Sequence, residues 1–331
     1  MVQERSVIQD IETRPMRERV GISIKKEGFT PGYSVQEVID EIKAMEDAGI
    51  QEVWVPQVGG IDTMTIFTAA ALQTKRIRFN LGIVPIYTRH PLVLAQQVVA
   101  FDGIAPGRLR LGIGSSNQGL MGMYGIQIEK PLTYLKEFMG ILRPVLETGQ
   151  VDFEGKYLHA HYHWLDNRIV NVPLMISALG EKAFETAGEI ADAALPWLAP
   201  VSYLHDTALP AIRKGAESRQ RQAPPIIASV LVALSEDKPA VQREAFKQLV
   251  IYLDVPYFPR LFEAAGLPLG PNNEGMERLL NALVVQGSAA EVEQQLRQIL
   301  SSELREINIT HVPVVDEKKE LAQLERIISN L

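Results

Sequence analysis

The chain has 331 residues, a formal net charge of −7 and no cysteine. Its 46% apolar and 22% charged residues indicate a filled core, in one large domain or two ordinary ones, and exclude a disordered chain. The negative charge and the lack of a basic block argue against binding to nucleic acid or to a membrane surface. Without cysteine there is no disulfide, thiol nucleophile or thiolate metal site.

The first 17 residues are charged and contain no apolar run, so we expect a loose leader rather than a signal peptide. Residues 18–331 are then expected to form a single domain. No apolar run approaches the ~20 residues that a membrane span requires. Together with the missing cysteines, these features predict a cytoplasmic protein.

Short apolar strands alternate with helices along the whole chain. The first strand is expected at 20–25, and Ser34 with Glu37 forms a capping box that begins the first helix, which Gly49 ends. Seven further strands are expected at 52–55, 78–84, 109–113, 174–177, 193–195, 226–232 and 307–312. Their helices are expected at 62–73, 90–101, 130–147, 181–190, 203–219, 239–252 and 317–329. The strands do not alternate cleanly between apolar and polar residues, which is typical of strands buried on both faces.

Eight strand–helix units predict an α/β fold of the closed (β/α)8 TIM-barrel type. An open, doubly wound sheet is the competing architecture. Two connections are longer than usual, and loops of this length in a compact domain usually cover a functional site. Residues 150–172 are expected to form a lid hairpin with its turn at Gly155, and residues 252–286 to contain a short helix at 274–283.

The fourth strand runs into the sequence GIGSSN at residues 112–117. A dinucleotide-binding turn is disfavoured, because Asn117 replaces the third glycine and no acidic residue ends a strand about 20 residues further on. A plain strand-ending turn would need Gly114 alone. Close approach of the backbone to a ligand is favoured, because active sites of this fold lie at the carboxyl ends of strands.

Two other strand ends carry polar turns. The third strand ends in GIVP at 82–85, and Arg89 in the following TRHP either meets an anion or faces solvent. The fifth strand is followed by SALG at 177–180 and a helix start, where free backbone N–H groups could bind phosphate. A second helix start at 287–291 is more simply explained by capping through Ser288.

His159, His161 and His163 alternate along HAHYH and would face one side of a strand. Imidazoles suit zinc, but no carboxylate falls in register within the segment and Asp166 only lies near it. We therefore predict a surface or lid element and no metal. No Ser-His-Asp order, HExxH or paired-carboxylate motif is present, which agrees with an organic redox cofactor that needs little beyond positioning.

Four segments carry a family resemblance: GIVPIYTRHP (82–91), GRLRLGIG (107–114), PLMISALG (173–180) and AGEIADAA (187–194). Together they resemble the luciferase-like superfamily of flavin and deazaflavin oxidoreductases over about residues 20–330. The TRHP turn, the LGIGSSN loop and the late VPYFPRLFEAAG are similar to its coenzyme F-420-dependent branch. The resemblance implies a barrel with an inserted lid, a non-prolyl cis peptide behind the cofactor ring near residues 82–84, and commonly a homodimer.

The resemblance also implies site residues. The cofactor ring and tail would be contacted by Gly82, Ile83, Val84, Ser115, Ser116, Ser177, Ala178, Leu179 and Gly180. Beyond what the resemblance implies, we expect Trp54 and Trp197 to line the substrate pocket, and Lys182 or Arg89 to meet the acidic tail of the coenzyme.

The chain departs from the sugar-phosphate dehydrogenases of this family. Those enzymes carry Asp-His after the second strand and a glutamate in the fourth-strand loop, where this chain has Pro56-Gln57 and Ser115. Sugar-phosphate oxidation is therefore doubtful. Gln57 is the best remaining catalytic candidate, although an amide cannot act as a base.

We predict a deazaflavin-dependent oxidoreductase that uses coenzyme F-420 to transfer hydride to or from a small organic substrate. An FMN-dependent monooxygenase of the same fold is the first alternative. A non-catalytic flavin-binding protein is the second.

Overall fold

The computed structural model describes residue 11 and residues 13–24, 34–58, 60–164 and 169–331. Most of the expected leader, the end of the expected first strand and Asp166 lie outside these residues. The described part of the leader packs against the domain: Ile11 is buried and Arg14 forms an ion pair with the buried Glu52, 3.0 Å between Nη1 and Oε1.

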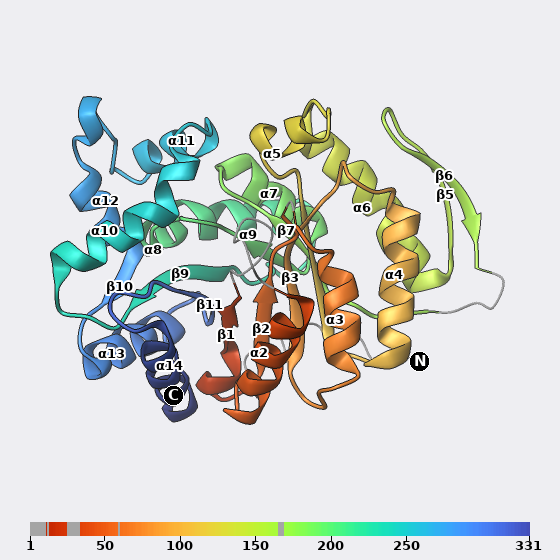
Figure 1. Ribbon diagram of the computed structural model, residues 1–331. Helices are drawn as coiled ribbons and strands as arrows, with labels where there is room; N and C mark the ends of the chain where they lie inside the picture. Colours follow the sequence, from red (N-terminus) through yellow and green to blue (C-terminus); the bar gives the residue numbers. More distant parts are fainter. Residues whose placement is uncertain (1–10, 12, 25–33, 59, 165–168) are drawn as a thin grey trace.

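Nine strands form one parallel sheet whose strand order is β10-β9-β11-β1-β2-β3-β4-β7-β8. The sheet curls, and its helices lie around the outside (Figure 1). Its strands are β1 (Val20–Ser23), β2 (Glu52–Val55), β3 (Arg78–Pro85), β4 (Leu109–Gly114), β7 (Leu174–Ser177), β8 (Ala193–Leu195), β9 (Ile227–Ala233), β10 (Val284–Gln286) and β11 (Glu306–His311).

The α-helices begin and end close to the positions expected from their capping residues. They are α2 (Val35–Asp47), α3 (Thr63–Ala71), α4 (Pro91–Ile104), α5 (Gln118–Met123), α6 (Pro131–Thr148), α7 (Glu181–Ile190), α8 (Val201–Tyr203), α9 (Leu209–Glu217), α10 (Lys238–Leu249), α11 (Tyr257–Ala264), α12 (Met276–Leu283), α13 (Ala289–Leu300) and α14 (Glu317–Asn330). Shorter helical turns are η1 (Met16–Arg19), η2 (Leu204–Ala208), η3 (Val250–Tyr252) and η4 (Pro271–Asn273).

The predicted α/β fold with parallel strands is confirmed, and so is the position of each of the eight expected strands. The strand order follows the chain from β1 to β8 without the reversal that a doubly wound sheet requires. β10 is an additional ninth strand beside β9. Between β8 and the start of β9 there is an isolated parallel bridge, Ala194 to Ile226, where Ala194 N–H donates to the Pro225 carbonyl at 2.9 Å.

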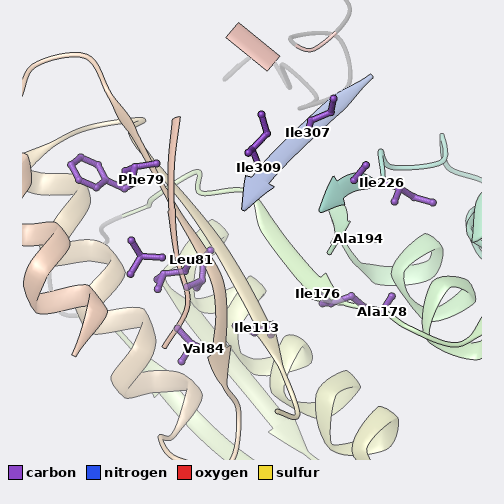
Figure 2. Packing of buried hydrophobic residues seen from close by; sticks show 14 of the residues in the cluster. Phe79, Leu81, Val84, Ile113, Ile176, Ala178, Ala194, Ile226, Ile307 and Ile309 are labelled. Atoms are coloured by element: carbon purple, nitrogen blue, oxygen red, sulfur yellow. The ribbon is translucent and has the colours of Figure 1, made fainter. Parts of the chain in front are cut away.

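Side chains on alternate strand positions divide between two apolar clusters. Those that point outward toward the helices form the main cluster, and Figure 2 shows examples such as Phe79 and Leu81 on β3, Ile113 on β4 and Ile309 on β11. The inward positions form a second, smaller cluster of Trp54, Met175, Ala193, Leu195 and Ile227. Apolar side chains therefore occupy part of both faces of the sheet, which explains why the strands lack clean alternation.

Charged side chains fill the inner space near the amino ends of the strands. Glu52 is fully buried and forms ion pairs with Arg14, Arg78 and Arg110. Glu306 is also buried, and its Oε1 lies 2.6 Å from Nη2 of Arg110. These arginines lower the pKa of Glu52 to about 2 against the opposing effect of burial, whereas burial raises the pKa of Glu306.

The two long connections have different positions. The expected hairpin exists as the antiparallel strands β5 (Gln150–Glu154) and β6 (His159–His163). It lies beside α6 at the edge of the molecule (Figure 1), where the Glu137 carboxylate of α6 accepts from the backbone N–H groups of Lys156, Tyr157 and Leu158. The other connection contains α11, η4 and α12. None of the helices described here is long and apolar enough to cross a membrane.

Candidate functional site

A bulge interrupts β3 where a cofactor-binding segment is expected. The pairing register with β4 shifts between Leu81 and Val84, and the peptide bond between Gly82 and Ile83 is cis, which confirms the expected non-prolyl cis bond. The Ile83 carbonyl accepts a hydrogen bond of 3.0 Å from the backbone N–H of Gln57 at the end of β2. Gly82 and Ile83 are partly buried, and Val84 is fully buried.

Trp54 lies beneath this bulge, inside the curled sheet. Its side chain is 1% exposed, and a Cβ atom at Gly82 would lie 3.2 Å from Trp54 Cε3. The Arg110 guanidinium lies 5.2 Å from the centre of a Trp54 ring. Trp54 therefore separates the buried charges below it from the strand ends above, and its ring does not reach solvent.

The glycines of β4 allow three strands to approach closely. A Cβ atom at Gly114 would overlap Oγ of Ser177 and would lie 3.1 Å from Cδ1 of Ile83, and a Cβ at Gly112 would overlap the Leu81 carbonyl. Both glycines lie within the strand, not in a turn after it. The ends of β3, β4 and β7 therefore pack closely together, with the side chains of Ser177 and Ile83 against Gly114, and we call the surface formed by these three strand ends the floor.

The residues after β4 line one side of this floor. Ser115 and Ser116 are partly buried, and the Ser115 hydroxyl donates to the Ser116 carbonyl at 3.3 Å. Ser116 adopts a left-handed backbone conformation with φ of +60°. Such a conformation in a non-glycine residue is often found at functional sites. Asn117 caps α5 by accepting from the backbone N–H of Leu120 at 2.9 Å.

The residues after β7 lead into a helix start without a side-chain cap. Ala178 is buried and its N–H donates to the Leu195 carbonyl at 3.1 Å, while the Leu179 carbonyl accepts from the Tyr203 hydroxyl at 2.9 Å. Gly180 is the N-cap of α7 and supplies no side chain, so backbone N–H groups of the first helical turn remain available to an anion.

The start of α13 differs from that of α7. Ser288 and Glu291 form a complete capping box, in which the Glu291 carboxylate accepts from the Ser288 N–H at 2.8 Å. The capping interpretation of this segment is therefore confirmed.

Three polar candidates from the sequence are bonded to neighbouring protein groups. Gln57 Oε1 accepts from the Thr63 N–H at 2.8 Å, and Gln57 Nε2 donates to the Val58 carbonyl at 3.2 Å. Arg89 Nη2 lies 2.9 Å from Oδ2 of Asp62, and its Nη1 donates to Gln97. Lys182 Nζ lies 2.6 Å from Oε2 of Glu185, on the surface of α7.

Aromatic side chains connect the end of β8 with the inserted segment. Trp197 follows β8, and its ring centre lies 6.1 Å from that of Tyr252 in η3. Tyr252 in turn lies 4.9 Å from Phe258, which lies 6.3 Å from Phe262, both in α11. Leu198, next to Trp197, also has a positive φ, at +51°, as Ser116 does.

A second group of aromatic side chains follows the end of β3. Tyr87, just after β3, donates its hydroxyl proton to the Glu129 carbonyl at 3.0 Å and lies 4.4 Å, centre to centre, from Tyr134. Burial, with smaller effects from Tyr134 and from Tyr257 of α11, raises the pKa of Tyr87 to about 12. Through Tyr252 and Phe258, α11 is therefore connected with Trp197 at the end of β8.

The three histidines of β6 are all exposed on one face of the hairpin, as expected. Sequence reasoning missed their carboxylate partners, because these lie on the paired strand: His161 contacts Asp152 at 2.6 Å and Glu154 at 2.8 Å, and His159 contacts Glu154 at 2.8 Å. These carboxylates raise the pKa of His161. Within the described residues there is no group of three or more His, Asp or Glu side chains that could hold a metal ion.

Comparison with known proteins identifies one family model and two enzymes of the same name that resemble this chain. Residues 19–304 match the family model described as luciferase-like monooxygenase. The 5,10-methylenetetrahydromethanopterin reductase of Methanolobus tindarius is 26% identical over 228 residues, 67% of this chain and 68% of that protein. The enzyme of the same name from Archaeoglobus fulgidus is 24% identical over 322 residues, 89% of this chain and 95% of that protein.

Among solved structures, an F-420-dependent secondary alcohol dehydrogenase in complex with an F-420–acetone adduct superimposes with a TM-score of 0.78. It is 18% identical, and the match covers 94% of this chain and 98% of that chain. At this identity the likeness shows the fold.

Proposed function

Because the chain belongs to the luciferase-like monooxygenase family, we propose that it is an oxidoreductase that binds coenzyme F-420 over the floor formed by β3, β4 and β7. Its substrate in this proposal is a small organic molecule held beneath α11. The reductases named among its relatives and the F-420-dependent dehydrogenase of similar fold support this choice of cofactor.

The residues present fit a planar cofactor with a phosphate-bearing tail. The floor is made of closely packed strand ends, and Ser115 and Ser116 supply short polar groups beside it. Gly82, Ile83 and Val84 would support the ring, while Ser177, Ala178, Leu179 and Gly180 would hold the tail at the start of α7. When bound, the deazaflavin carries a hydride to or from the substrate.

In this proposal Gln57, Trp197 and Trp54 support the site without reacting with the substrate. Gln57 acts as a positioning residue, because its N–H holds the Ile83 carbonyl and its amide is bonded to Val58 and Thr63. Trp197 forms a wall of the substrate pocket. Trp54 supports the floor from below, since its side chain is buried.

The single observation that carries the proposal is that the β3 bulge, the polar residues after β4 and the uncapped start of α7 meet at this floor. The test is titration of the purified protein with coenzyme F-420 and, separately, with FMN, followed by absorbance and fluorescence. We expect tight binding of the deazaflavin. Tight binding of FMN with none of the deazaflavin would overturn the assignment.

An FMN-dependent monooxygenase is the second candidate, because the N–H groups at the start of α7 suit the phosphate of either cofactor. Oxygen consumption coupled to substrate oxidation separates the two, since a deazaflavin reacts poorly with oxygen. Tight cofactor binding without turnover of any acceptor would instead indicate a non-catalytic flavin-binding protein.

The proposal also covers the closure of the barrel, the domain, the location and the oligomeric state of the protein. The sheet closes as an eight-stranded barrel through the bridge between Ala194 and Ile226, with β10 outside the ring. Residues 18–331 form one domain of a cytoplasmic homodimer. Light scattering coupled to size-exclusion chromatography measures the oligomeric state, and a monomeric mass would contradict the dimer.

A further inference from the structure

The sheet has a break between β8 and β9. These strands meet only at the bridge between Ala194 and Ile226, and β10 pairs with β9 only from Leu231 onward. On its other side β9 is paired without interruption with β11, from Ile227 to Val232. Within the part of the chain that the structure describes, no strand therefore pairs with the β8-facing edge of β9 between Ile226 and Leu231.

A cavity of about 300 Å³ lies against this unpaired edge. Ser229 and Val230 of β9 line it from the sheet, and Ala199 and His205, which follow β8, line it from the other side of the break. Residues of β10, α12 and α13 complete it, and these three elements lie together on one side of the molecule (Figure 1). The cavity shares no lining residue with β3, β4 or β7, so it is separate from the floor.

Polar side chains of the cavity are left without hydrogen-bond partners. Neither the His205 imidazole nor the Ser229 hydroxyl, both partly buried, has a partner among the described residues. The same holds for the amide of Gln298, which is exposed at the rim. His205 lies in η2, a π-helical turn in which the Leu209 N–H donates to the Leu204 carbonyl five residues earlier. Such turns are rare and occur often at functional sites.

The cavity favours an uncharged ligand. No Lys, Arg, Asp or Glu of the described residues lines it. The charged residues next to its lining in the chain are already paired, Arg297 with Glu293 at 2.8 Å and Glu303 with Arg213 at 2.6 Å. A charged ligand would lose its hydration here without gaining an opposite charge from these side chains.

The lining also indicates what an uncharged ligand would contain. Branched aliphatic side chains supply apolar walls, among them Val201, Val230, Val285 and Ile299. A neutral imidazole, a hydroxyl and an amide each offer both a donor and an acceptor. A ligand that fits such walls therefore combines an apolar ring with a group that both donates and accepts, and an amide is the simplest group of this kind.

We propose that this cavity is a second binding site, for a small uncharged ring compound that carries an amide. The ring packs between the aliphatic walls, and the amide bonds to His205, Ser229 and Gln298. Because the ligand contacts β9 on one side and η2 on the other, it bridges the break in the sheet and stabilises the folded protein. The inference does not rest on the proposed function.

The test measures binding of two probes that share one ring. The full chain, with 13C-labelled methyl groups in Val, Leu and Ile, is titrated at pH 8 with nicotinamide and with the negatively charged nicotinate. We expect nicotinamide to shift the methyl signals of Val230, Val285 and Ile299 and to leave Ile83 at the floor unchanged. Nicotinate should bind at least about tenfold more weakly. Equal binding of nicotinate, shifts at Ile83 alone, or no saturable binding of nicotinamide would overturn the inference.

Variants test the polar contacts. Ser229→Ala removes one hydroxyl and should weaken nicotinamide binding by about three- to tenfold, the value of one neutral hydrogen bond. Gln298→Met, at an exposed position, provides a second variant in case Ser229→Ala folds poorly, and the same loss is expected. Gln294→Met is the matched control, since Gln294 is exposed on the same helix and does not line the cavity. Affinity equal to that of the control in the folded variant would contradict the site.

Discussion

Arg89 and Asp62 are joined by an ion pair of 2.9 Å between the end of β3 and the start of α3. Asp62 is at the same time the N-cap of α3, accepting from the Thr65 N–H at 2.9 Å. The Arg89 and Thr65 contacts lower the pKa of Asp62 against the effect of burial. Arg89 thus fixes the loop that carries Gln57, instead of presenting its charge to a ligand.

Replacement of Arg89 is therefore expected to affect stability more than cofactor binding. Arg89→Met should lower the free energy of unfolding by about 1 kcal/mol, as for a partly exposed ion pair, and leave the Kd of coenzyme F-420 within twofold. Asp62→Asn is the control, since Asn keeps the cap but loses the charge. Urea denaturation and cofactor titration measure the two effects, and a Kd raised more than tenfold in Arg89→Met alone would show direct contact with the coenzyme.

The second prediction concerns the glycines of β4. Gly112→Ala places a Cβ atom against the Leu81 carbonyl, which is backbone and cannot rotate away, so we expect a loss of about 2–3 kcal/mol. Gly103→Ala in α4 is the matched change at an open position, with no atom within 4 Å, and should stabilise the protein by about 0.5–1 kcal/mol. Equal stability of the two variants in thermal denaturation would contradict the close approach of β3 and β4.

The third prediction distinguishes the two buried glutamates. Glu52→Gln leaves Arg14, Arg78 and Arg110 without their shared carboxylate and should cost about 3–5 kcal/mol. Glu306→Gln should change stability by less than about 1 kcal/mol, because the amide oxygen still accepts from Arg110 and one buried negative charge is removed. Denaturation at pH 7 measures both, and a larger loss for Glu306→Gln would refute this assignment.

Acid titration gives an independent check on Glu52. Its pKa in the folded protein is about 2, against an ordinary value of 4.5. A lowered carboxyl pKa stabilises the fold fully above the ordinary value, and the contribution disappears as the pH falls toward the folded value. The difference in unfolding free energy between wild type and Glu52→Gln should therefore shrink steadily between pH 4.5 and 2. A difference independent of pH in this range would argue against an ionised Glu52.

The fourth prediction concerns the attachment of the hairpin. Glu137 accepts from three consecutive backbone N–H groups at 2.7–3.0 Å, and Glu137→Gln replaces this carboxylate by an amide with one acceptor oxygen. We expect faster amide exchange over residues 150–163, with a local loss of about 1–3 kcal/mol. Glu147→Gln, an exposed change on the same helix, serves as the control. Unchanged exchange in the hairpin would disprove the attachment.

Local signals in the sequence were sufficient for most of the fold. The capping box of Ser34 and Glu37 begins α2 and the left-handed Gly49 follows its end, both as expected, because these interactions span only a few residues. β10 was missed, because its three residues lie inside the segment 252–286 that was expected to be a long connection. The sequence also indicated the bulge at Gly82, through resemblance rather than through spacing.

The site was less predictable, because its contacts join residues distant in the chain. Whether Arg89 faces a ligand depends on Asp62, 27 positions earlier, and the burial of Trp54 depends on how β1 and β3 approach its ring. The partners of His161 became visible only with the pairing of β5 and β6. Sequence patterns identify candidate residues, and tertiary contacts determine which of them can still contact a ligand.

The isolated bridge between Ala194 and Ile226 has a consequence for how the molecule can be divided. Elsewhere in the sheet neighbouring strands share a ladder of several residue pairs, whereas β8 and β9 meet at this single pair. Local unfolding of the sheet should begin between β8 and β9, since separating these two strands breaks the fewest backbone hydrogen bonds. A polypeptide cut between α9 and β9 should accordingly yield two fragments that reassemble into the native form, because the new chain ends lie where β8 and β9 share a single residue pair.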